Sequence, residues 1–465
     1  MSRPRVLIIG AGPAGMFAAD ALAGDAEVTV IEQGRQIDSR RCPPGPRCEC
    51  DPCSILEGTG GAGGLSDGKI TLSLGRGTQK ESIFSPEDQR HLDRIDQTVV
   101  KFAGLGVWYE PVEDSPYTEK FREVGLEFDS YPLRHVGSDG IQRYVKGHRE
   151  DLIRRGVFIR EEEVVQGLER DPQGPIVAWV WKRDQLFTVT EEYDYVVIAV
   201  GLAGTGWTES VLEGLSVDTM PGPAGFGMRL EAPAEVLAPL FETFYDFKIE
   251  RDYPPIGSIR SFCCNQRGEV VNENHRDIGI RNVNGHSYLD PRRRTEFSNF
   301  AMIMKVGTDL SQWEGWTGMT PQEYVRKLAR SINVRAGGTA IQSISSFMDY
   351  WADTAASGGY TNPKATPHNI SKDLPEDIRD AYQDYLYRLT KVLPDLEEHG
   401  NIYAPEIKYY ARKAPVERGA WSLPHGPNDR IYITGHATGY FDSYTASGIT
   451  GIQAAEDIIR RERER

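Results

Sequence analysis

The chain has 465 residues, of which 39% are apolar, and 48 glycines besides. At this length the composition predicts a globular protein of two or three domains and excludes a disordered, collagenous or coiled-coil architecture. A formal net charge of −15 would repel phosphate backbones, which argues against a nucleic-acid partner. No apolar run approaches the length of a membrane span and no cleavable leader precedes the first strand, so we expect a cytoplasmic protein without a membrane anchor.

The first 32 residues predict a βαβ unit. The nearly uniform apolar run at residues 5–9 is typical of a parallel strand that is buried on both faces. A glycine-rich turn follows, then a helical stretch at 16–22 and a second strand at 27–31. Nucleotide-binding α/β folds begin with a unit of this kind.

The turn of this unit has the spacing Gly10-x-Gly12-x-x-Gly15. The first glycine permits a tight turn, the second lets the backbone approach a pyrophosphate, and the third lets helix and strand pack closely. Glu32 follows Gly10 by 22 residues and is placed to bind an adenosine ribose hydroxyl, which disfavours the 2′-phosphate of NADP. A second match to the spacing, at 58–63, lacks a buried strand before it and a helix after it, so we do not interpret it as a second dinucleotide site.

The following segments alternate helices and strands before the composition changes. We expect helices at 86–103, with Ser85 as N-cap, and at 139–155, and strands at 157–160, 164–168, 176–181, 187–190 and 195–200. Residues 206–424 carry most of the Pro, Trp and Tyr, with expected helices at 321–331 and 375–392 and a strand holding Cys263 and Cys264. This change predicts a second domain at 206–424, inserted into a discontinuous first domain made of 1–205 and 425–465.

Four of the six cysteines, Cys42, Cys48, Cys50 and Cys53, fall within twelve residues. Their spacing fits neither a paired zinc site nor a regular iron–sulfur run. Structural thiols, a metal site and a redox dithiol formed by Cys50 and Cys53 all remain alternatives.

The C-terminus has a strand at 430–434, a glycine turn at Gly435, and a helix expected at 448–462 that begins at Gly448. In flavoproteins of the glutathione-reductase type, such a strand passes the ribityl chain and the helix N-terminus points at the flavin N1–C2=O edge, where its dipole stabilises reduced flavin. A nicotinamide dehydrogenase needs no such C-terminal unit. The pattern therefore favours FAD over NAD.

With both ends considered, the chain resembles a family of FAD-dependent dehydrogenases whose reactions are mostly unassigned. The stretches that carry the resemblance are Val6-Leu-Ile-Ile-Gly-Ala-Gly-Pro-Ala-Gly15, Gly60-Gly-Ala-Gly-Gly-Leu-Ser-Asp-Gly-Lys69, Arg260-Ser-Phe-Cys263, Asn284-Gly-His-Ser287, Ser298-Asn-Phe-Ala301 and the C-terminal glycine turn. The resemblance implies an α/β fold: an FAD-binding, Rossmann-type (glutathione-reductase-like) three-layer domain with an inserted α+β substrate domain. Related flavoproteins carry Gly-Asp in the C-terminal turn, where this chain has Gly435-His436.

We expect the loop at 60–69 to wrap the pyrophosphate and flavin, with Lys69 offsetting phosphate or reduced-flavin charge; a flexible surface loop is the alternative. The expected cofactor-binding residues are Gly10, Ala11, Gly12, Pro13, Ala14, Gly15, Glu32, Gln33, Gly61, Ala62, Gly63, Ser66, Lys69, Val164, Gly201, Gly435, His436, Gly448 and Ile449. Candidates for catalysis are His436, which could titrate near the flavin, Lys69 and His286. Arg260, Asn284 and the Tyr409–Tyr410 pair are further polar candidates for the substrate side.

These features predict an FAD-dependent oxidoreductase that passes a hydride between a small organic substrate and flavin N5, with the substrate in the cleft between the two domains. Two alternatives stay open: a flavin monooxygenase, although its usual Asp-Gly pair is replaced by residues 202–205, and a redox-idle protein that holds FAD to present a binding surface. The sequence does not decide whether NAD(P)H or another electron donor or acceptor docks.

Overall fold

A parallel sheet joins the two ends of the chain. The computed structural model describes residues 3–465 apart from 43–49, 76–82, 105, 113–114, 171–173, 184–185, 277, 307–315, 317, 350–355, 357, 410, 425 and 427. Within these, five parallel strands run in the order β21-β11-β1-β2-β7. They are β1 (Arg5–Ile9), β2 (Glu27–Glu32), β7 (Phe158–Glu161), β11 (Tyr195–Ile198) and β21 (Ile431–Ile433). The predicted βαβ unit and the predicted C-terminal strand are therefore confirmed as parts of one sheet.

Each face of this sheet packs against a different layer. Val6 and Ile8 of β1 face the helices α1 (Pro13–Leu22), α2 (Gln89–Ala103), α4 (Gly137–Arg154) and α11 (Tyr444–Glu464). Leu7 and Ile9 face a three-stranded antiparallel sheet. That sheet consists of β8 (Glu163–Arg170), β9 (Ile176–Lys182) and β10 (Phe187–Tyr193). The apolar run at residues 5–9 reads as continuous because both faces are covered.

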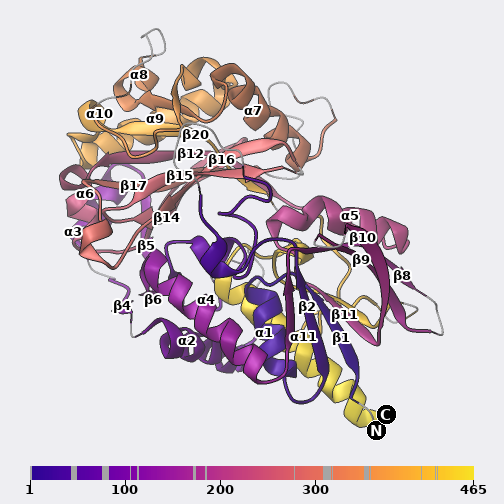
Figure 1. The fold of residues 1–465 in the computed structure, drawn as a ribbon. Coiled ribbons are helices and arrows are strands. Elements are labelled where there is room, and N and C mark those ends of the chain that lie inside the picture. Colours follow the sequence, from indigo (N-terminus) through magenta and orange to yellow (C-terminus); the bar gives the residue numbers. More distant parts are fainter. Residues whose placement is uncertain are drawn as a thin grey trace.

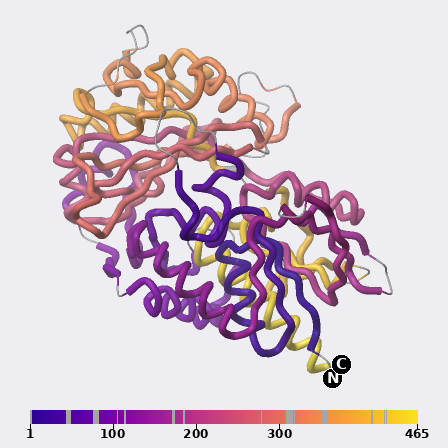
Figure 2. The backbone as a smooth tube through the Cα atoms, in the orientation of Figure 1, coloured from indigo at the N-terminus to yellow at the C-terminus, as the bar shows by residue number. Residues whose placement is uncertain are grey.

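Helices α1 and α11 bring the N- and C-terminal segments into contact. A Cβ at Gly451 of α11 would lie 2.1 Å from the Ala14 carbonyl oxygen of α1, so only glycine permits this helix crossing. Figure 2 shows the indigo N-terminal and yellow C-terminal segments lying side by side. The two chain termini also emerge next to each other.

A second, eight-stranded sheet lies across from the first (Figure 1), in the order β19-β18-β20-β12-β17-β14-β13-β5. Its strands are β5 (Glu127–Ser130), β12 (Ala224–Pro233), β13 (Phe247–Tyr253), β14 (Gly257–Asn265), β17 (Phe297–Val306), β18 (Ala340–Ser343), β19 (Thr366–Pro367) and β20 (Asn401–Tyr409). All neighbours are antiparallel except β18 and β19.

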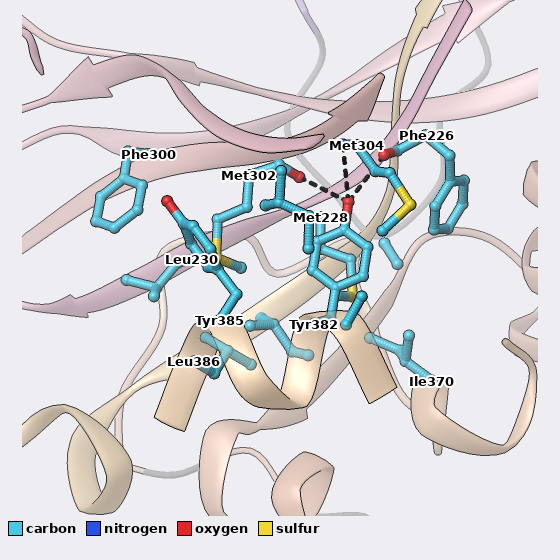
Figure 3. Packing of buried hydrophobic residues seen from close by; sticks show 14 of the residues in the cluster. Phe226, Met228, Leu230, Phe300, Met302, Met304, Ile370, Tyr382, Tyr385 and Leu386 are labelled. Carbon is cyan, nitrogen blue, oxygen red and sulfur yellow. Dashed lines mark hydrogen bonds between the residues drawn. The ribbon is translucent and has the colours of Figure 1, made fainter. Parts of the chain in front are cut away.

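One face of this sheet is closed by α7 (Pro321–Ala336) and α9 (Glu376–Val392). Figure 3 shows Tyr382 of α9 reaching up to the strands, where its hydroxyl donates to the Phe226 carbonyl oxygen (2.8 Å) and accepts from the Met304 amide (3.1 Å). The buried phenol thus satisfies backbone groups of two strands at once. The opposite face of the sheet is left to line a cavity.

Shorter elements complete the described residues. The remaining strands are β3 (Lys69–Thr71), β4 (Val107–Tyr109) and β6 (Leu133–His135), which form one small sheet, and the hairpin β15 (Glu269–His275) and β16 (Ile280–His286). The remaining α-helices are α3 (Pro116–Glu123), α5 (Thr205–Gly214), α6 (Ala234–Phe241), α8 (Ile344–Met348) and α10 (Leu396–His399). The 3₁₀ helices are η1 (Ile37–Ser39), η2 (Ala62–Leu65), η3 (Pro86–Asp88), η4 (Leu202–Gly204), η5 (Pro291–Arg293), η6 (Ile370–Lys372) and η7 (Gly435–Thr438). None of the described helices has both the length and the apolar character needed to cross a bilayer.

Helix boundaries depart from the sequence predictions where a cap was missed. Helix α11 begins at Tyr444, four residues before the predicted start, because the Ser443 side chain accepts a hydrogen bond from the Ala446 amide and caps it. The expected helix at 321–331 continues to Ala336 and ends at Gly337, whose φ is 72°. The domain division at 205 and 425 stays a prediction, with one departure: β5, from the first segment, is an edge strand of the second sheet.

Candidate functional site

A cavity of about 390 Å³ lies between the carboxyl ends of the parallel strands and the open face of the eight-stranded sheet. In parallel α/β sheets, ligands bind at this edge. The residues that line it from the first sheet and its loops are Gly10, Gly12, Pro13, Ala14, Glu32, Gln33, Leu56, Glu57, Gly58, Gly61, Ala62, Gly63, Ser66, Asp67, Lys69, Thr71, Ala199, Val200, Gly201, Leu202, Ala203, Thr434, Gly435, His436, Asp442, Ser443, Tyr444 and Ser447.

The three glycines of the first turn have different surroundings. A Cβ at Gly10, where φ is +101°, would lie 2.5 Å from the Ala199 carbonyl oxygen, and one at Gly15 would lie 2.0 Å from the Gly10 carbonyl oxygen. A Cβ at Gly12 would meet only the Gly61 Cα, at 3.8 Å, within the cavity lining. Gly10 and Gly15 therefore serve the fold, whereas the missing side chain of Gly12 leaves space for a ligand.

Gly12 is also the N-cap residue of α1, and among the described residues no side chain caps this helix. The first turn, which begins with Pro13, carries no acidic residue. Uncapped amides and the positive end of the helix dipole attract an anion. The turn therefore offers a phosphate-sized anion site at the cavity wall.

Glu32 lies at the end of β2 with both carboxylate oxygens engaged by the backbone. Its Oε2 accepts from the Ala11 amide (2.9 Å), and its Oε1 accepts from the amides of Gly34 (2.8 Å) and Gly58 (3.1 Å). The carboxylate thus holds the glycine turn, the end of β2 and the following loop together. Oε1 already accepts two hydrogen bonds, whereas Oε2 accepts only one and retains a lone pair for a ligand hydroxyl in the cavity.

The C-terminal turn reaches the cavity through different residues from those expected. Tyr444 and Ser447, in the first turn of α11, line the cavity. Gly448 and Ile449 do not, because the helix starts earlier than predicted and Gly448 packs against Phe17 and Ile95. The Gly435 amide donates to the Thr450 hydroxyl (2.8 Å), which fixes the turn against the helix.

Most of the other sequence-predicted residues line the cavity. Of the residues expected to bind the cofactor, those that line the cavity are Gly10, Gly12, Pro13, Ala14, Glu32, Gln33, Gly61, Ala62, Gly63, Ser66, Lys69, Gly201, Gly435 and His436. Ala11 and Gly15 are buried behind the turn, and Val164 pairs with Trp181 within the three-stranded sheet. His286 is buried in β16 away from the lining, and burial lowers its pKa. Tyr410 lies outside the described residues.

Lys69 is held in a buried ion-pair cluster. Its Nζ lies 2.9 Å from Asp67 and 3.4 Å from Asp246, and it donates to the Cys264 carbonyl oxygen (2.9 Å). Burial works against the charge, but the two carboxylates outweigh it and raise the pKa of Lys69 well above its ordinary value. The ammonium therefore ties the glycine loop to the second sheet and stays protonated.

The sequence analysis missed most of the wall contributed by the second sheet. The residues lining it from the second sheet and the segments next to its strands are Tyr131, Asp246, Lys248, Arg260, Phe262, Cys263, Glu406, Ile407 and Lys408, and the β15–β16 hairpin adds Glu273, Asn282 and Asn284. Of these, only Arg260 and Asn284 were singled out as substrate-side candidates. A usable signal was the alternation in β20, where Glu406 and Lys408 stand among apolar residues with the period of a strand.

A buried arginine forms an ion pair with one acidic residue of this wall. Arg229 of β12 is fully buried and forms a bidentate ion pair with Glu406, at 2.8 and 2.7 Å. Its Nη1 also donates to the Asn265 and Asn299 side chains (3.1 and 2.9 Å). Such a fork-shaped pair fixes the direction of the Glu406 carboxylate at the cavity.

Cys263 lies in the cavity lining on a β-bulge of β14, with φ at 48°. This left-handed conformation costs a side chain about 1–2 kcal/mol. Glycine does not have this cost, but it lowers the free energy of unfolding by about 0.5–1 kcal/mol relative to alanine, because its unfolded chain has more conformational freedom. We therefore expect Cys263→Gly to be more stable than Cys263→Ala by about 0.75 kcal/mol, the difference between the midpoints of these two ranges.

Urea denaturation of the two variants, which lack the same thiol, measures this difference. Equal stabilities, or a more stable alanine variant, would show that the backbone at residue 263 is not strained. Cys264 offers a matched comparison, because it is buried in the same strand without a positive φ. There alanine should be at least as stable as glycine.

The cysteine cluster shows no metal site in the part of the chain that the structure describes. Cys42, Cys50 and Cys53 are free thiols, and no group of three or more His, Cys, Asp or Glu residues there is arranged to hold a metal ion. Cys48 lies outside the described residues. Burial raises the pKa of Cys53 to about 11, which makes it a poor nucleophile at neutral pH.

Comparisons with known proteins are distant. No protein-family model matches the chain. It is 23% identical to an uncharacterized protein of Clostridium beijerinckii over 99% of this chain and 81% of that one. Among solved structures it is similar to a flavoprotein/dehydrogenase from Cytophaga hutchinsonii (11% identity, TM-score 0.41, 99% of this chain and 79% of that one). It is also similar to a glycine oxidase from Geobacillus kaustophilus (12%, TM-score 0.43, 99% and 95%). TM-scores of this size do not establish a common fold.

Proposed function

We propose that this protein is an FAD-dependent oxidoreductase, with the dinucleotide in the cavity described above. The observation that carries the proposal is the junction of Gly12, Glu32 and Gly435 on one cavity wall. A pyrophosphate needs close backbone approach and a helix N-terminus, and a ribose needs a fixed carboxylate. The first two strands supply all three features, and the C-terminal turn extends the same wall.

The surroundings of two further glycines fit a bound molecule of this length. Gly201, at the end of β11, has φ of +66° and no atom within 4 Å of the position its Cβ would take, although it lines the cavity. Gly61 faces Gly12 across the turn, so two backbones without side chains form one narrow cradle. We assign Gly12 and Gly61 to the pyrophosphate, Glu32 to the adenosine ribose, and Gly435 with His436 to the ribityl and flavin end.

When bound, the flavin supplies hydride exchange at N5 with an organic substrate. The chain's own residues hold the reacting partners together and limit access of water. Lys69, kept protonated by Asp67 and Asp246, has its charge compensated by these carboxylates and fixes the loop that lines the cavity. The second sheet provides the substrate side, because its polar residues face the same cavity from the opposite wall.

Anaerobic reduction of the purified protein by a panel of organic donors, followed by stopped-flow absorbance, tests the proposal. We expect bleaching of the flavin band by at least one donor class, with no need for oxygen. A protein that keeps its colour with every donor would contradict a redox role and favour the alternative in which FAD holds a binding surface. Consumption of oxygen coupled to hydroxylated product would point instead to a monooxygenase.

A further inference from the structure

Three cationic side chains from separate strands gather at the substrate wall of the cavity. They are Lys248 of β13, Arg260 of β14 and Lys408 of β20. All three lie against one aromatic ring: Lys248 Nζ, Arg260 Cζ and Lys408 Nζ are 4.7, 4.5 and 6.0 Å from the ring centroid of Phe262. The chain as a whole has a net charge of −15, so three cationic side chains around one ring are unusual in it and call for an explanation.

The strand register places these residues on one face. Arg260 pairs with Ile303 of β17, and Ile303 pairs with Gly227 of β12. Lys408 pairs with Gly225, two residues along β12 on the same face. Strands β12 and β17 lie between Arg260 and Lys408. The two β12 positions on this face are glycines, and the side chain of Ile303 from β17 lies over them. The alternation of side chains along these paired strands therefore places Arg260 and Lys408 on the same face of the sheet.

The three cations are only loosely engaged by the protein. Lys248 lies 3.9 Å from Asp246, and Arg260 lies 3.9 Å from Glu250, both beyond hydrogen-bonding distance. None of the three donates a hydrogen bond to any residue that the structure describes. Buried or partly buried donors normally have partners, so these groups are available to a ligand.

The acidic residues of the same wall are, by contrast, already paired. Glu406 is held by the bidentate contact with Arg229, and Glu273 lies 3.2 Å from His275 Nε2 and accepts from the Asn284 amide at 2.6 Å. Arg229 therefore offsets the charge of Glu406, whereas Glu273 is held by hydrogen bonds and lies within the electrostatic reach of Lys408. Burial disfavours the charged form of Lys408, but nearby acidic groups, led by Cys263 and then Asp442, outweigh it and raise its pKa. Lys408 is consequently charged at neutral pH.

We propose that Lys248, Arg260 and Lys408 bind the carboxylate of a small organic acid, which is the substrate class of the proposed flavoenzyme. This inference rests on the proposed function for its catalytic meaning, but the anion site itself depends only on the second sheet. The guanidinium fork of Arg260 matches the two oxygens of a carboxylate, and the lysines add point charges. Phe262 and Ile407 offer apolar contact for the body of the acid.

Isothermal titration calorimetry of the FAD-containing protein with benzoate and with benzamide tests the inference. The two probes share a ring and differ in charge. We expect benzoate to bind at least about ten-fold more tightly than benzamide, since hydrogen bonds to a charged group contribute most. Lys408→Gln and Arg260→Gln should each weaken benzoate binding about ten-fold and leave benzamide binding unchanged.

Lys101→Gln serves as the matched control, because this lysine is exposed on α2 with 60% of its side chain accessible. It should not change either affinity. Equal binding of benzoate and benzamide, or benzoate binding that Lys408→Gln and Arg260→Gln leave intact, would overturn the carboxylate site. Tighter binding of inorganic phosphate than of benzoate would overturn the assignment to carboxylates.

FAD content, measured from visible absorbance on the same samples, separates the two proposals. Lys408→Gln and Arg260→Gln should leave it unchanged, because these two residues lie on the wall opposite the glycine turn, and Lys101→Gln should leave it unchanged because Lys101 lies outside the cavity. Charge-selective benzoate binding by a protein that holds no FAD would retain the anion site and contradict the flavoenzyme. Bound FAD without charge-selective benzoate binding would retain the flavoenzyme and contradict the anion site.

Discussion

The Gly12→Val variant is expected to fold normally and to retain almost no FAD. At Gly12 φ is −76°, which any residue adopts, and the only atom within 4 Å of a new Cβ is the Gly61 Cα at 3.8 Å. The added isopropyl group would therefore enter the cavity, where a pyrophosphate needs the bare backbone. The cost in unfolding free energy should be no more than about 1 kcal/mol, because valine is a poor N-cap.

Visible absorbance of the purified variant, together with its urea denaturation curve, measures both effects. Gly167→Val is the matched control: this glycine, in β8, also has open space around its Cβ and no positive φ, but it lies outside the cavity. That variant should keep its FAD. Gly15→Val should instead fail to fold, since its Cβ would lie 2.0 Å from the Gly10 carbonyl oxygen. Full FAD content in Gly12→Val would refute the placement of the pyrophosphate.

Replacing Arg229 by Met should lower the unfolding free energy by about 3–5 kcal/mol. Arg229 is fully buried, and its removal leaves the Glu406 carboxylate without its bidentate partner inside the second sheet. An unpaired buried charge costs more than the loss of the pair itself. The effect is expected even though the substitution conserves volume and apolar packing.

The double variant Arg229→Met with Glu406→Gln separates two effects: the loss of the contacts of Arg229, and the cost of leaving the Glu406 carboxylate buried without a partner. Because it removes both charges together, it should recover a substantial part of the stability lost in Arg229→Met. Urea denaturation of the wild type, the two single variants and the double variant completes the cycle. Strict additivity of the two single effects would mean that Arg229 and Glu406 do not stabilise each other.

The first turn was predictable from sequence because its signals are local. A buried strand, three glycines at fixed spacing and Glu32 all lie within the first 32 residues, and short-range sterics dictate the conformation of the turn. The contacts of Glu32 with the amides of Gly34 and Gly58 were not predictable, because the loop that brings Gly58 to the end of β2 has no periodic pattern. The side chain was expected to bind a ligand, and it also organises the turn.

The substrate wall could not be assembled from sequence because it joins distant strands. Lys248, Arg260 and Lys408 come together only once β20, β12, β17, β14 and β13 have paired in that order. Nothing in the local pattern of β20 specifies its neighbours, since pairing depends on non-local contacts and packing on α7 and α9. The predicted start of α11 was wrong for a simpler reason. Ser443 is a good N-cap, but the prediction gave more weight to Gly448.

Heating the purified protein to release its bound small molecule, followed by mass spectrometry, identifies the cofactor that the cavity holds. We expect FAD in close to equimolar amount with the wild-type chain, and its near absence from Gly12→Val prepared in parallel. A wild-type protein that releases no FAD, and takes up none on incubation with it, would contradict the assignment of this cavity to FAD.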